Sequence, residues 1–258
     1  MKLSYNRKLD ALERREARML REKPPGPAAA VRARLEEKIP AGLRQTLDGA
    51  FYKAFQLLFE RGGPLLEKTF PGEKLADVHA ELAGALDGRA LRRMNRGAGV
   101  SGGLGACAAA LEGGALGVLG IGLPDIPVLL GLLLKNLYET ALRYGFPYDT
   151  PQERCYLLLL LCAALGEERG AYGAEADRFA RALDHGWSVS FDLEGQIRET
   201  AGVLSRRLLV NKFVQGLPVV GVAGGVTNFT VSRRVSAYGA LKYQKRFLEK
   251  KRWEGFAP

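Results

Sequence analysis

Five consecutive leucines, Leu157–Leu161, lie in a segment whose beginning has the features of a helix N-terminus. Thr150 is a good capping residue, Pro151 takes the first helical position, and Glu153 completes a capping box. The helix is predicted to end near Gly166. Because a helix that is apolar on nearly all sides has to be buried, other elements must surround it. The chain therefore has to build a core around this segment.

The rest of the chain also indicates helices, because the alternating apolar and polar pattern of strands is missing. Helices are predicted over residues 10–22, 31–38, 43–59, 125–144 and 235–253. We therefore expect an all-α fold, a single helical domain with glycine-rich, tightly packed central helices. Residues 1–24 are expected to form a charged N-terminal helix and the start of a proline linker, and residues 25–258 the main domain.

Glycines concentrate in two neutral segments of the chain. Residues 97–131 hold eleven of the 32 glycines, although glycine inside a helix costs up to ~1 kcal/mol per residue. Pairs spaced four apart favour close helix packing. These pairs are Gly99 and Gly103, Gly113 and Gly117, and Gly221 and Gly225. The first interpretation of these segments is a helical hairpin buried in a soluble fold. Reversible contact with a membrane and a true membrane-spanning hairpin are the alternatives. Spanning is opposed by Asp125, which lies between two prolines and would be costly inside a bilayer.

The formal net charge of +10 indicates an anionic partner, and cations border both neutral segments. The C-terminal helix has a basic amphipathic pattern typical of binding to anionic lipid, although an ordinary solvated face would give the same pattern. The residues interpreted as membrane-facing are Arg92, Arg93, Arg96, Arg233, Arg234, Lys242, Lys245, Arg246, Lys250 and Lys251. Nucleic acid is not expected, because aromatic residues are sparse among the cations.

Two sequence patterns of known catalytic or cofactor sites occur in the chain, but the strand that each requires is missing. Ser101 lies in Gly-Val-Ser-Gly-Gly, but no strand precedes it as a nucleophile elbow requires. The overlapping G-x-G-x-x-G pattern also lacks its strand. Two histidines and three cysteines have no metal-ligand spacing, so no metal and no cofactor are expected.

Five polar residues in or beside the neutral segments are candidates for a core or a pocket. They are Glu112, Asp125, Lys135, Glu139 and Asn228. Lys135 and Glu139 lie four residues apart on one predicted helix and are expected to pair. Asp125 is also expected to cap the start of that helix.

Several motifs together resemble the EcsC protein family. They are a Leu-Pro-Asp-Ile-Pro junction at residues 123–127 after a glycine-rich stretch, a helix end at Tyr144-Gly145-Phe146, and a helix that carries Glu153-Arg154. Residues 217–228 resemble a later family segment, whereas Asp149 stands two residues beyond the usual acid. The resemblance implies an all-helical protein on the cytoplasmic side of a bacterial cell, with membrane association, and it transfers no catalytic residue.

The leading hypothesis from the sequence is a non-enzymatic accessory protein of the cytoplasm, peripheral on the inner face of the cell membrane. Its partner would be the anionic membrane surface or a membrane complex of transport or secretion. A lipid or fatty-acyl binding module is a second hypothesis, with a lipid ligand between the glycine-rich helices. A hydrolase that uses Ser101 and an integral membrane hairpin are further alternatives.

Overall fold

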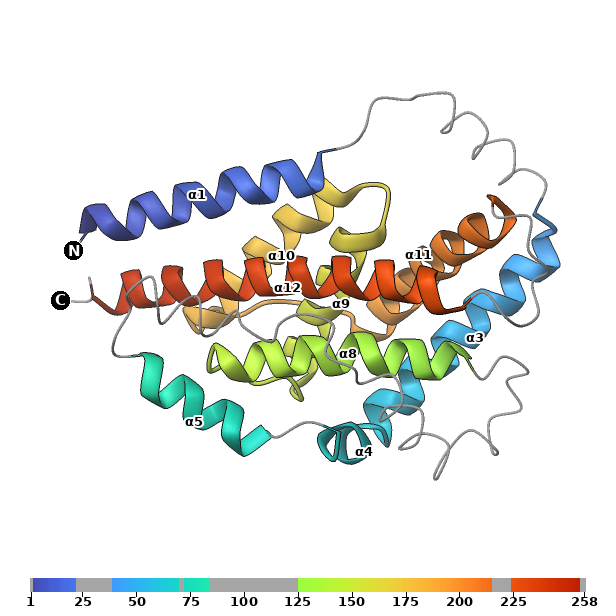
Figure 1. Cartoon of the computed structure of the whole chain (residues 1–258), viewed down its shortest axis with the longest axis horizontal. Coiled ribbons are helices and arrows are strands. Elements are labelled where there is room, and N and C mark those ends of the chain that lie inside the picture. The colour runs from blue at the N-terminus through green and yellow to red at the C-terminus, as the bar shows by residue number, and fades with distance from the viewer. Residues whose placement is uncertain (1, 22–38, 70–71, 84–124, 215–223, 256–258) are drawn as a thin grey trace.

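A computed structural model describes residues 2–21, 39–69, 72–83, 125–214 and 224–255 of the chain (Figure 1). Throughout these ranges the regular secondary structure is helical, which confirms the all-α prediction. The helices are α1 (Lys2–Leu20), α3 (Ala41–Glu60), α4 (Gly63–Glu67), α5 (Gly72–Ala83), α8 (Asp125–Arg143), α9 (Pro151–Leu165), α10 (Arg169–Asp184), α11 (Leu193–Val214) and α12 (Gly224–Glu254).

Helix α9 forms the centre of the fold, as its leucine run predicts. The backbone N–H of Glu153 donates to the Thr150 side chain at 3.2 Å, Pro151 opens the helix, and Gly166 follows its last residue. Every residue from Cys155 to Leu165 is buried. Helices α10, α11 and α12 pack around it, so apolar neighbours replace water on all its sides.

Helix α8 is a second buried helix, and it ends where the sequence predicts. All residues from Gly131 to Ala141 are buried, and α8 packs against α3, α5 and α12. Gly145 then adopts a left-handed φ of 74° that terminates the helix. A Cβ at this position would collide with the imidazole of His79 on α5, so the turn requires glycine for both its conformation and its space.

Helices α8 and α12 approach closely at Gly239. A Cβ added to Gly239 would overlap the Leu137 side chain, so the absence of a side chain sets the separation of these helices. The glycine pairs predicted for such packing lie elsewhere. Gly99, Gly103, Gly113, Gly117 and Gly221 are outside the described residues, and Gly225 lies in the first turn of α12, where its packing role stays a prediction.

Helix α1 packs against α12 and α10, and its beginning lies at the same end of the molecule as the end of α12 (Figure 1). Leu9 and Leu12 anchor one face of α1 in the core. At its other end, Arg169 donates to the backbone carbonyls of Met19 and Arg21, each at 3.4 Å. None of the described helices combines the length and the apolar character that crossing a membrane requires.

Candidate functional site

Several cations of the basic face predicted for the C-terminal helix are buried inside the fold. Lys242, Lys245 and Arg246 are 1%, 6% and 4% exposed, so the interpretation of these three side chains as membrane-facing is wrong. A buried cation needs an anionic partner, because removing an unpaired charge from water is very costly. Each of the three has such partners on helices distant in sequence.

Lys242 and Lys245 join α12 to α1 and α10 through two carboxylates. Lys242 donates to Glu16 at 2.7 Å and also to Asp177, and Lys245 donates to the same two carboxylates at 3.1 Å and 2.7 Å. Tyr238 adds a hydrogen bond to Glu16 at 2.9 Å. Burial would raise the pKa of Asp177, but the two ammonium groups outweigh that effect and hold it below its ordinary value.

Arg246 forms a second buried cluster beside the first. Its guanidinium donates to both oxygens of Glu153, at 2.6 and 2.8 Å, and to both oxygens of Asp184, with a shortest distance of 2.8 Å. The rings of Phe146 and Tyr156 lie 4.2 and 4.9 Å from its central carbon. Burial lowers the pKa of Arg246, but the hydrogen bonds to Glu153 and Asp184 raise it further, so it stays charged. The Glu153 carboxylate is therefore bound to Arg246. Of the predicted capping box, the hydrogen bond from the Glu153 backbone N–H to the Thr150 side chain is present.

The predicted pair on α8 is present and belongs to the core. Lys135 donates to Glu139 at 2.6 Å, with side chains 4% and 9% exposed, which confirms the pairing. Asn136, next to this pair, donates to Ser232 of α12 at 3.0 Å. Of the other candidates, Glu112 lies outside the described residues. Asp125 begins α8 and Asn228 lies in α12, but the positions of their side chains are not described.

Those of the remaining predicted surface cations that the structure describes lie near opposite ends of α12. Arg233 is exposed and Arg234 is half-buried on α12, where burial and the nearby charges of Arg169 and Arg207 lower the pKa of Arg234 to about 10. At the far end of α12, Lys250 lies 5.6 Å from the centre of the Phe146 ring. Lys251 pairs with Glu254 at 2.8 Å. Arg92, Arg93 and Arg96 are outside the described residues.

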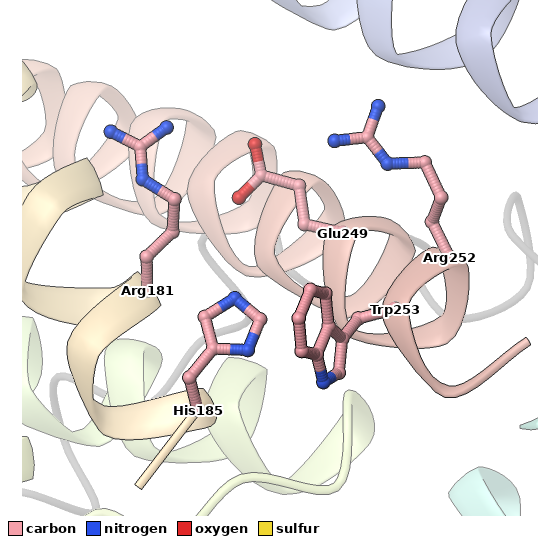
Figure 2. A pocket seen from close by; sticks show the side chains of 5 residues that line it. All are labelled: Arg181, His185, Glu249, Arg252 and Trp253. Atoms are coloured by element: carbon pink, nitrogen blue, oxygen red, sulfur yellow. The ribbon is translucent and has the colours of Figure 1, made fainter. Parts of the chain in front are cut away.

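A groove opens between the C-terminal ends of α10 and α12 (Figure 2). Its lining residues are Arg181, His185, Glu249, Arg252 and Trp253, and its volume is about 290 Å³. Figure 2 shows the Arg181 and Arg252 side chains on either side of Glu249, with His185 and Trp253 facing each other below them. The site therefore combines charged groups of both signs with an aromatic wall.

Of the two tryptophans of the chain, Trp253 lines the groove and Trp187 contacts its His185. The His185 ring centre is 4.7 Å from that of Trp187 and 4.3 Å from that of Trp253, so the imidazole contacts both indoles. Trp187 is 61% exposed and Trp253 is 57% exposed. Exposed aromatic side chains that gather at one place are typical of a surface that contacts a partner or a membrane.

The charged side chains of the groove have no ion-pair partner in the part of the chain that the structure describes. Within the described residues, Arg181, Glu249 and Arg252 form no ion pair within 4 Å. Burial raises the pKa of Glu249, against the opposing effects of Lys245, Arg181 and Arg252. Three incompletely neutralised side chains in one recess are available to a ligand with complementary charges.

The described residues contain no metal-site cluster and no activated cysteine. No cluster of three or more His, Cys, Asp or Glu side chains there has the arrangement of a metal site. Cys155 and Cys162 are buried, and burial raises the pKa of each thiol to about 12, so neither is a reactive nucleophile. Ser101 lies outside the described residues.

The sequence alone did not identify the groove. Trp187 and Trp253 are far apart in the chain, and no motif links either of them to His185 or Arg181. The available signal was that a chain with only two tryptophans places one beside a histidine and the other next to a run of three cations, Lys250–Arg252.

Comparison with known proteins gives one family. A sequence model described as the EcsC protein family matches residues 6–248. No curated protein and no solved structure matches the chain. The match covers nearly the whole chain, including most of α1 and most of α12.

Proposed function

This chain belongs to the EcsC protein family, and we propose that it is a non-enzymatic helical protein that docks from the cytoplasm on the anionic inner face of a membrane. The groove between α10 and α12 is the proposed contact. The observation that carries the proposal is the exposed Trp253 in the groove with Arg181 and Arg252, together with the exposed Trp187, which contacts His185 of the same groove.

The chemistry of these side chains suits the boundary between headgroups and acyl chains. An indole places its apolar rings toward the hydrocarbon and its N–H toward water, which is why tryptophan is enriched at membrane interfaces. Arginine binds phosphate through its planar set of N–H donors. Combining both residue types in one exposed place supports shallow insertion, together with electrostatic attraction to anionic lipid.

The buried clusters narrow the docking surface that the sequence alone suggests. Lys242, Lys245 and Arg246 are buried in ion pairs with carboxylates of other helices, so these groups are not at the surface where headgroups would bind. The contact is therefore proposed at the last turn of α12 and the end of α10, not along the whole basic helix.

Replacing Arg181 and Arg252 together with glutamine is expected to weaken binding to anionic vesicles by about thirtyfold. Each cation near an anionic bilayer contributes about 1 kcal/mol, and loss of two gives that factor. Flotation with vesicles of phosphatidylglycerol and phosphatidylcholine, over a series of lipid concentrations, measures the change. Binding of the unmodified chain should also decrease as salt rises.

The matched control is the pair Arg61→Gln and Arg206→Gln. Both arginines are exposed, and their loss changes the net charge equally. Unchanged flotation of this control supports docking through the groove. Equal losses in both double variants would show that only net charge matters, and absence of flotation by the unmodified chain would remove the proposal.

A further inference from the structure

We infer that the groove selects a phospholipid headgroup that carries both a phosphate and a primary ammonium group, as phosphoethanolamine does. The inference rests on the proposed docking function and gives it a headgroup preference. Its basis is the order of charges across the groove, with Glu249 between Arg181 and Arg252 (Figure 2).

The two arginines match the phosphate. Guanidinium groups hold phosphate oxygens through charge-assisted hydrogen bonds. Neither Arg181 nor Arg252 has an ion pair among the described residues, so their donors are available. They come from two different helices, α10 and α12, whose packing fixes the opening between them.

Glu249 makes the groove less favourable for a ligand that carries only negative charge. Its carboxylate is half-buried in the groove and would repel a phosphate placed between the arginines. An ammonium group on the same ligand removes this repulsion, because it can donate to Glu249 while the phosphate contacts the arginines. Trp253 also lines the groove, and an indole ring attracts cations.

The size of the groove favours a headgroup over an acyl chain. Its volume of about 290 Å³ is at the lower end of ligand sites, and its lining residues are charged or aromatic, although the surface that they expose in the groove is mostly apolar. A fatty acyl chain would need a longer apolar cavity.

Tryptophan fluorescence of the full chain tests the inference directly, because Trp253 lines the groove and Trp187 contacts its His185. The titrants are soluble glycerophosphoethanolamine and glycerophosphoglycerol, two phosphodiesters that differ in the ammonium group. We expect the first to bind about tenfold more tightly. The variant Glu249→Gln should lose this preference, whereas Glu60→Gln, an exposed glutamate on α3, should keep it. Equal affinities, or a preference that survives Glu249→Gln, would overturn the inference.

A vesicle experiment separates this inference from the docking function. Flotation compares phosphatidylethanolamine with phosphatidylcholine at one fixed fraction of phosphatidylglycerol, and the ethanolamine vesicles should bind more chain. If the chain binds phosphatidylethanolamine and phosphatidylcholine vesicles equally, and has equal affinities for the two soluble phosphodiesters, the docking proposal stands and headgroup selection is contradicted. Absence of binding to any vesicle, with a clear preference for soluble glycerophosphoethanolamine, contradicts docking and supports the headgroup site.

Discussion

Replacing Arg246 with methionine is expected to destabilise the fold by about 3–5 kcal/mol. The substitution leaves the carboxylates of Glu153 and Asp184 without the guanidinium that now binds both of them. The Glu153 side chain is only 5% exposed and that of Asp184 only 11%, so water has little access to replace the lost hydrogen bonds. Urea unfolding followed by circular dichroism measures the change in the free energy of unfolding.

Arg252→Met is the matched control, because it removes an arginine from the same helix at an exposed position. It should change stability by less than about 0.5 kcal/mol. Similar small losses in both variants would show that the Arg246 cluster contributes nothing beyond an ordinary surface charge. The combined variant Arg246→Met and Glu153→Leu should recover part of the stability, because apolar groups can replace a buried ion pair.

Replacing Lys242 with methionine is expected to cost about 3 kcal/mol at neutral pH. Glu16 and Asp177 would then share the single ammonium of Lys245. Because α1 is tied to α12 through Glu16, loss of Lys242 should also loosen α1. Denaturant unfolding gives the stability, and hydrogen exchange along α1 gives the local effect.

The effect of Lys242→Met should depend on pH in one direction. The pKa of Asp177 is lowered in the folded chain, so its contribution is complete above the unfolded pKa of about 3.9 and is lost as pH falls through the lower folded value. The stability difference between the unmodified chain and the variant should therefore shrink in acid. A difference that stays constant down to pH 2 would contradict a role for the Asp177 carboxylate.

Local sequence signals are enough to predict the two central helices. The Thr150 cap, the leucine run and Gly166 define α9, and Gly145 ends α8, because each signal acts within a few residues. The pairing of Lys135 with Glu139 is also local, since one helical turn separates them. Such features need no knowledge of which helix packs on which.

The orientation of α12 could not be predicted in the same way. An amphipathic pattern places cations on the outer face, but Lys242, Lys245 and Arg246 point inward because their carboxylate partners lie on other helices. Those partners come from α1, α9 and α10, and their side chains meet only once the helices are packed. The groove is hidden for the same reason, since Arg181 and Trp253 belong to different helices.

The emission of the two tryptophans on adding anionic vesicles is the most direct test of groove-mediated docking. Because the chain has no other tryptophan, the signal comes from Trp253, which lines the groove, and from Trp187, which contacts His185 of the groove. Docking through the groove predicts a shift to shorter wavelength and quenching by lipids brominated near the headgroup. Unchanged emission and no quenching, in a sample where flotation shows the chain bound, would place the contact on another surface and contradict the account.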